Sequence, residues 1–114
     1  MGNLSKEKNM TDDLMAPLRT KYVAKLRDRR PEIADFLALC QSEQPGPEIR
    51  EEMRHKVHGL AGSGATYGFS RISTTARALE MALDSDSVIE SSILAKLTQA
   101  LLETCDQVLG GPPK

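Results

Sequence analysis

Apolar residues recur along this chain at intervals of three or four, which is the spacing of one face of an α-helix. No stretch alternates apolar and polar residues as a half-buried strand does. The apolar stripes predict helices over residues 12–29 with a continuation to residue 42, then 47–67, 70–83 and 89–108. The stripes consist of Leu14, Leu18, Tyr22 and Leu26; Ile33, Leu37 and Cys40; Ile49, Met53, Val57, Leu60 and Gly64; Ile72, Ala76, Leu79 and Leu83; and Ile89, Ile93, Leu97, Ala100, Leu101, Cys105 and Val108.

Proline, glycine and short polar residues separate these stripes. Residues 44–47 (Gln-Pro-Gly-Pro) predict a loop, because proline and glycine interrupt regular structure. Pro31 predicts a boundary or kink, since proline inside a helix removes a backbone hydrogen bond. Gly68 is expected to end the third helical segment, Ser70 to cap the next, and residues 84–87 to form a turn.

The resulting pattern predicts an all-α chain. Amphipathic helices joined by short connections favour an antiparallel four-helix bundle, with a short or kinked additional N-terminal helix. We expect one helical bundle domain over residues 11–110, flanked by a flexible N-terminal segment (1–10) and a flexible tail (111–114). From the starting methionine and the Gly-Pro-Pro tail we expect a free-standing protein rather than a piece of a longer chain.

Composition narrows the classes of function. Fifteen Lys and Arg residues against sixteen Asp and Glu residues give no basic excess, which argues against nucleic-acid binding. No apolar run reaches the roughly 18 residues of a membrane span, and the N-terminus lacks a signal-peptide core. Cys40 and Cys105 each fall among apolar positions, as buried reduced thiols do. A cytoplasmic monomer is therefore expected, without nucleic-acid or membrane partners.

The two histidines of the chain are predicted to point into solvent. With Ile49 at 0° and 100° added per residue, the apolar face of its helix centres near roughly 50°, His58 falls near roughly 180° and His55 near roughly 240°. The two histidines are three residues apart, so they are neighbours on one surface of the helix.

Small residues surround these histidines. Glycine within a helix costs roughly 1 kcal/mol of stability relative to alanine. The presence of Gly59, Gly62 and Gly64 in one helix therefore requires an explanation. Gly64 points toward the core, where it lets a neighbouring helix approach. Gly59 and Gly62 are predicted to point outward, with Ala61 and Ala65 beside them. Such an outward clearing indicates that another macromolecule brings a reactive group close to a histidine.

These residues resemble the motif of the histidine-containing phosphotransfer (HPt) domains of phosphorelays. In that motif a histidine is followed by an apolar residue, a glycine, a small residue and a later glycine. His58, Leu60, Gly62, Ser63 and Gly68 fill these positions.

The same motif chooses between the two histidines. Counted from His55, the position of the later glycine holds Ala65, so His58 fits better. The segment from Phe69 to Leu83, including Ala-Arg-Ala-Leu-Glu at 76–80, is similar to the helix that follows the motif.

The resemblance implies that His58 accepts a phosphoryl group from the aspartyl phosphate of a receiver domain and passes it to another receiver. The partners would be response-regulator receiver domains or a hybrid sensor kinase. The chain would be a relay intermediate without kinase activity of its own. It would need no cofactor, since Mg²⁺ would belong to the receiver.

The resemblance also assigns roles around His58. Gly59, Gly62 and Ala65 would permit close docking of the partner. Ala61 stands where the family usually has a lysine that holds the phosphoryl group. That leaves the electrostatic role to Arg54, to protonated His55, or to a cation of the partner.

Two alternatives use the same residues differently. His55 and His58, joined by Glu51 or Glu52, have the spacing of metal ligands on one helix face. The chain is also compatible with a non-catalytic adaptor or structural bundle, in which the histidines are ordinary surface residues.

Overall fold

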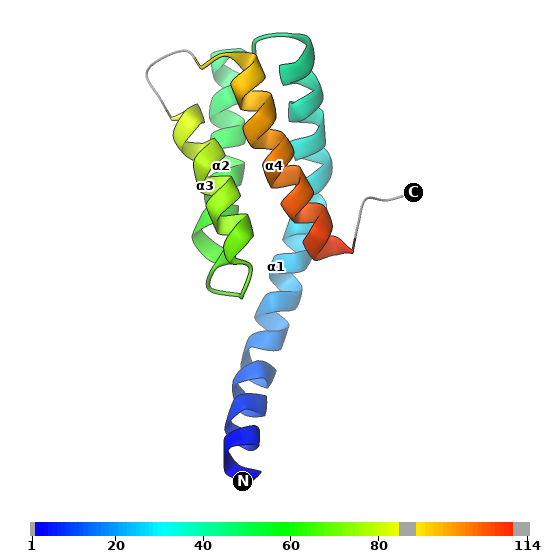
Figure 1. Cartoon of the computed structure of the whole chain (residues 1–114), viewed down its shortest axis with the longest axis vertical. Helices are drawn as coiled ribbons and strands as arrows, with labels where there is room; N and C mark the ends of the chain where they lie inside the picture. Colours follow the sequence, from blue (N-terminus) through cyan, green and yellow to red (C-terminus); the bar gives the residue numbers. More distant parts are fainter. Residues whose placement is uncertain (1, 85–88, 111–114) are drawn as a thin grey trace.

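The computed structural model describes residues 2–84 and 89–110, with side chains from residue 14 onward. Within these residues it contains helices and no strand, so the predicted all-α fold is confirmed. The helices are α1 (Gly2–Ser42), α2 (Pro47–Gly64), α3 (Ser70–Leu83) and α4 (Ser91–Leu109). They form a four-helix bundle in which α2 packs on α3, α3 on α4 and α4 on α1, with a smaller contact between α1 and α2 (Figure 1).

The first helix is longer and less interrupted than its sequence predicted. It begins at Gly2 and runs through both Pro17 and Pro31, so no separate N-terminal helix precedes the bundle. Leu26 and Ile33, on either side of Pro31, are 0% and 1% exposed. Packing of the apolar stripe on both sides of Pro31 therefore outweighs the cost of about 3 kcal/mol that an internal proline imposes.

The N-terminal part of α1 projects beyond the other three helices (Figure 1). The flexibility expected for residues 1–10 stays a prediction. The tail at 111–114 and most of the turn expected at 84–87 lie outside the described residues.

One apolar core lies between the four helices, and most of the predicted stripe positions contribute to it. Its fully buried side chains come from every helix of the bundle. The largest of them are Leu26, Ile33, Leu60, Ile72, Leu79, Leu94 and Leu101.

Five of the predicted core positions are instead exposed, and one of them is Ala100 of α4. Leu14 (74% exposed) and Leu18 (43%) lie on the N-terminal half of α1, where no other helix covers them. Ile49 (44%) and Ile93 (48%) lie in the first turns of α2 and α4. A periodic stripe shows which face of a helix is apolar, but it does not show how far along the helix the neighbouring helices reach.

The two cysteines are buried and free, as predicted. Burial raises the pKa of the Cys40 thiol to about 11 and that of the Cys105 thiol to about 12. Both thiols are therefore protonated and unreactive near neutral pH.

The connection between α2 and α3 departs slightly from the predicted one. Helix α2 ends at Gly64, three residues before the expected end. Gly68 was expected to end the helix but lies in the turn after it, with φ +91°, a left-handed conformation that glycine adopts most easily. Ser70 is the first residue of α3; Phe69 occupies the N-cap position without a side-chain capping bond.

The end of α2 packs closely against α3. The Ser73 hydroxyl donates to the Ala61 carbonyl oxygen (2.9 Å) and accepts from the Ala65 N–H (2.7 Å). A Cβ at Gly64 would lie 2.7 Å from Ser73 Oγ and 3.0 Å from the Tyr22 hydroxyl. Gly64 therefore faces the core, as predicted, and its missing side chain admits the serine.

We expect Gly64→Ala to lower the free energy of unfolding by roughly 1–3 kcal/mol, because the added methyl group overpacks this contact. The matched change Gly62→Ala meets nothing within 4 Å and should raise stability by up to about 1 kcal/mol through helix propensity. Urea denaturation followed by circular dichroism measures both. Equal effects of the two substitutions would contradict the close packing at Gly64.

Candidate functional site

Both histidines lie on the outer face of α2. The side chain of His58 is 68% exposed and that of His55 is 69% exposed. On the opposite face, Val57 and Leu60 are completely buried. The predicted outward direction of the histidines is therefore observed.

His58 is held by an acidic residue of the neighbouring helix. Its ring nitrogen Nδ1 is hydrogen-bonded to Oε2 of Glu80 on α3, whose side chain is only 18% exposed. An ionised carboxylate can only accept hydrogen bonds, so the proton lies on Nδ1. In the neutral imidazole the other nitrogen, Nε2, then carries a free lone pair. Glu80 thus both orients the ring and selects its tautomer.

The surface beside His58 is open at Gly62 and Ala65. No atom lies within 4 Å of the position that a Cβ at Gly62 would take, and Ala65 is exposed. Two other small residues were wrongly expected to share this clearing. Ala61 is 4% exposed, because it packs between α2 and α3. Gly59 is half-buried and faces α1, where a Cβ would lie 2.9 Å from the Nζ of Lys25.

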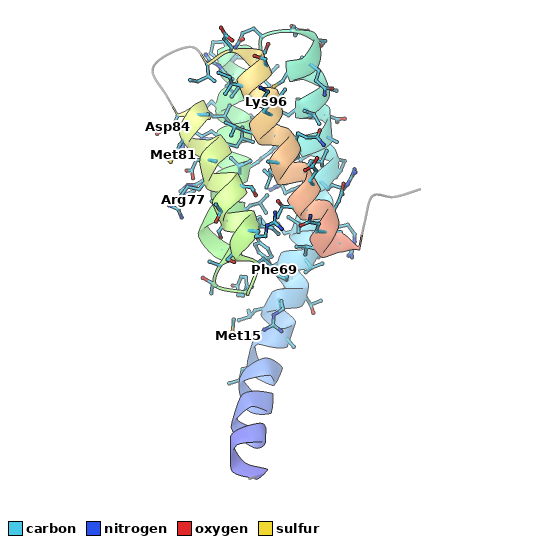
Figure 2. All side chains as sticks on the ribbon, viewed as in Figure 1. Met15, Phe69, Arg77, Met81, Asp84 and Lys96 are labelled. Carbon is cyan, nitrogen blue, oxygen red and sulfur yellow. The ribbon has the colours of Figure 1, made fainter. Side chains whose placement is uncertain are left out.

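The expected phosphate-binding arginine is engaged by carboxylates. Arg54 donates to both carboxylate oxygens of Glu51, at 2.9 and 2.6 Å, and its Nε lies 3.8 Å from Asp84 at the end of α3. The hydrogen bonds that Arg54 donates to Glu51 raise the pKa of Arg54 and lower the pKa of Glu51. Figure 2 shows Asp84 at the outer side of α3.

His55 also contacts Glu51, and its Nε2 lies 3.1 Å from the Glu51 carboxylate. The acidic partner of His58 is Glu80 instead. The two histidines therefore do not share one acidic partner. Within residues 14–84 and 89–110, no three His, Cys, Asp or Glu side chains are grouped so that they could hold a metal ion.

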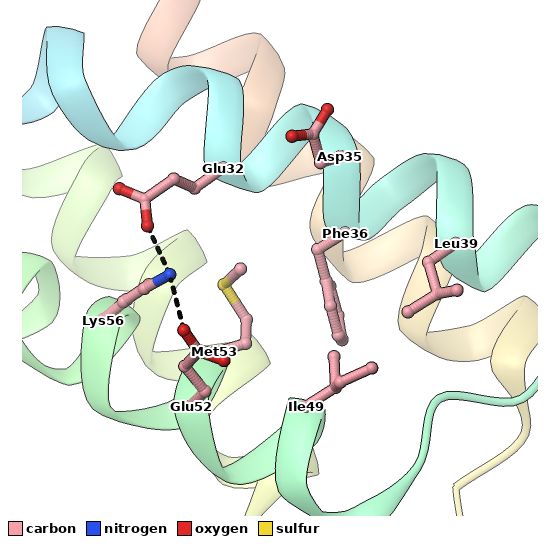
Figure 3. Close-up of a pocket in the computed structure, with 8 residues that line it drawn as sticks. All are labelled: Glu32, Asp35, Phe36, Leu39, Ile49, Glu52, Met53 and Lys56. Carbon is pink, nitrogen blue, oxygen red and sulfur yellow. Dashed lines mark hydrogen bonds and ion pairs between the residues drawn. The ribbon is translucent and has the colours of Figure 1, made fainter.

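On the side of α2 that faces α1, a lysine joins two acidic residues. Lys56 forms ion pairs with Glu52 at 3.3 Å and with Glu32 of α1, and its amine lies between the two carboxylates in Figure 3. The hydrogen bond to Glu32 raises the pKa of Lys56. A pocket between α1 and α2 opens next to this group, and Phe36 and Met53 are among the residues that line it (Figure 3).

Two residues of this site were not identified from the sequence. Glu80 lies at the edge of the apolar stripe of α3, one residue after the buried Leu79. Lys25 lies at the edge of the stripe of α1, one residue before the buried Leu26. Edge positions point toward a neighbouring helix, but which residue they meet depends on the register between helices.

The described part of the chain has no helix that combines the length and the hydropathy required to cross a bilayer.

An outward histidine oriented by a carboxylate, beside a glycine clearing on a four-helix bundle, defines a site suited to accept a group from another protein. The sequence profile of the Hpt domain family matches residues 17–110, which is most of the chain, and the chain belongs to this family. No similar chain was found among curated proteins or among solved structures. Family membership assigns the chain a phosphotransfer-related role in a phosphorelay, with receiver domains or kinases as its partners.

The Glu80 contact predicts the tautomer of neutral His58. In the native protein we expect Nδ1 to carry the proton, whereas Glu80→Ala should shift the population toward the Nε2-protonated form, because Nδ1 loses its acceptor. Nitrogen-15 NMR of the imidazole rings above their titration range distinguishes the two forms. The spectrum of His55 in the same sample is the internal control. An unchanged His58 spectrum in Glu80→Ala would contradict the orienting role of Glu80.

Proposed function

We propose that this protein is a histidine phosphotransfer protein in which His58 accepts a phosphoryl group from the aspartyl phosphate of one receiver domain and transfers it to another. The observation that carries the proposal is the exposed His58 ring with Nδ1 bound to Glu80. This contact turns the nucleophilic lone pair of Nε2 away from the protein. The proposal goes beyond family membership in naming the phosphorylated residue and the direction of its attack.

The proposed step is a displacement at phosphorus. The Nε2 lone pair of His58 forms the bond to phosphorus while the bond from phosphorus to the aspartyl oxygen breaks, and the carboxylate leaves with that electron pair. The imidazole ring becomes positively charged as the new bond forms, and the proton stays on Nδ1. The Glu80 carboxylate stabilises this charge through the hydrogen bond that already orients the ring. The reverse reaction on a second receiver regenerates neutral His58.

The docking surface in this proposal centres on Gly62 and includes Ala65 and His55, all exposed on the same face of α2. Phosphoryl transfer depends chiefly on positioning and charge stabilisation, so a bare helical surface is sufficient to host it. Because no side chain projects at Gly62, the active-site rim of a receiver can approach the histidine. Ala61 and Gly59 belong to the packing against α3 and α1 and are left out of this surface.

We also propose where the metal ion, the cofactors and the kinase activity of the relay reside. Mg²⁺ is supplied by the receiver, and this chain takes no cofactor and has no kinase activity of its own. A cytoplasmic monomer that binds no nucleic acid agrees with two free buried thiols and a formal net charge of −1.

The test of the proposal is transfer from receiver domains charged with acetyl phosphate. Native protein should acquire acid-labile, base-stable phosphate that mass spectrometry locates on His58. We expect His58→Gln to abolish labelling and His55→Gln to retain it, since both substitutions remove an equally exposed imidazole from the same face. Labelling of His55, or of neither histidine by any receiver of a broad panel, would overturn the proposal and favour the adaptor alternative.

The open surface at Gly62 gives an independent prediction. Gly62→Leu should slow transfer from a phosphorylated receiver by at least about tenfold, a barrier of about 1.4 kcal/mol, because the side chain occupies the approach to His58. Ala100→Leu places the same leucine side chain at an exposed position of α4 and should leave transfer unchanged. Rapid-quench measurement of phosphohistidine provides both rates. Normal transfer by Gly62→Leu would show that the clearing has no role in docking.

A further inference from the structure

A phosphoryl group on His58 carries up to two negative charges at neutral pH, so a positive charge nearby would stabilise it. Among the residues that the structure describes, the carboxylate that contacts the His58 ring is Glu80, which is negative and is hydrogen-bonded to Nδ1. Ala61, one turn after His58, is apolar and buried. Any electrostatic stabilisation from this chain must therefore come from a basic residue elsewhere around α2.

Three basic residues of α2 are already paired. Arg54 and His55 both contact Glu51, and Lys56 forms ion pairs with two other carboxylates, those of Glu32 and Glu52. Each would have to give up an existing ion pair before it bound phosphate. Such exchange offers little net gain on an exposed surface, where single ion pairs contribute between about 0 and 1 kcal/mol.

Lys25 of α1 is different. It is exposed, and it forms no ion pair with any side chain that the structure describes. Its ammonium group approaches α2 at Gly59, the residue directly after His58, so closely that a Cβ there would lie only 2.9 Å from Nζ. The missing side chain of Gly59 thus leaves room for the ammonium group next to the helix that carries His58.

The helical positions place the open surface between these two groups. At 100° per residue, Gly62 projects about 40° from His58 and about 60° from Gly59 around the axis of α2. His58 leans toward α3, where Glu80 holds it, and Gly59 faces α1, where Lys25 lies. The space above Gly62 is therefore bordered on one side by the reactive imidazole and on the other by an ammonium group on a flexible four-carbon stem.

We propose that Lys25 binds the oxygens of the phosphoryl group on His58 across the open surface at Gly62, so that α1 supplies a positive charge that the paired basic residues of α2 do not. This inference rests on the proposed phosphorylation of His58. Lys25 moves from Gly59 onto the phosphoryl oxygens as the P–N bond forms, and no proton is transferred. Because the interaction exists only when the group is on His58, it favours the phosphorylated state without contributing to the unphosphorylated one.

The experiment uses the His55→Gln chain, so that all phosphohistidine lies on His58. Phosphoramidate serves as a small donor that needs no docking surface, and a receiver charged with acetyl phosphate serves as the protein donor. We expect Lys25→Met to slow labelling by both donors about fivefold to tenfold, an effect that added salt reduces. Lys25→Arg should retain most of the rate, since it keeps the charge.

Lys96→Met is the matched control, because it removes the same charge from an exposed position on α4 (Figure 2). Circular dichroism and thermal melting verify that each variant remains folded.

If Lys25→Met is labelled as fast as Lys96→Met by phosphoramidate, the role of Lys25 is disproved while phosphorylation of His58 stands. Slower labelling by the receiver alone would assign Lys25 to docking and overturn its contact with phosphate. Absence of phosphate from His58 in the parent chain would overturn the proposed function and this inference together.

Discussion

The close approach of α2 and α3 at Gly64 is the constraint on which the candidate site depends. With no side chain at that position, Ser73 enters far enough to bond the backbone of α2 at both Ala61 and Ala65. These bonds fix how far α3 is displaced along α2. Glu80 lies seven residues, or about two helical turns, after Ser73 and is thereby placed opposite His58. A packing detail inside the bundle therefore sets the geometry of a histidine on its surface.

Three glycines within six residues of α2 have three different surroundings. Gly64 permits close packing inside the bundle, and Gly59 leaves room for a lysine from α1. Gly62 is the only one of the three with no atom near its missing side chain. The sequence pattern correctly placed Gly64 toward the core, but it assigned Gly59 and Gly62 to one outward clearing. The directions of Gly59 and Gly62 differ by about 60°, which is enough to face a neighbouring helix rather than solvent.

The general fold followed from the sequence because helical periodicity is a local property. The stripes identified the buried faces of all four helices, and proline and glycine marked both the loop before α2 and the break at Gly68. The continuity of α1 through Pro31 did not follow, since it depends on packing contributed by the other helices. The exposure of Leu14 depends likewise on where those helices end. In the site, the outward direction of His58 was predictable from α2 alone, whereas Glu80 and Lys25 come from helices whose register the sequence does not show.

The bond between His58 and Glu80 has a consequence for the direction of signalling under the proposed function. Both residues belong to one chain, so every receiver that docks meets the same oriented imidazole, whether it arrives as donor or as acceptor. Because the phosphorylated bundle is the intermediate shared by both half-reactions, its stability cancels from the overall equilibrium between the two receivers. Net flux through the relay is then governed by the abundance of the two receivers and by how quickly each of their acyl phosphates hydrolyses. The bundle itself acts as an exchange point without a preferred direction.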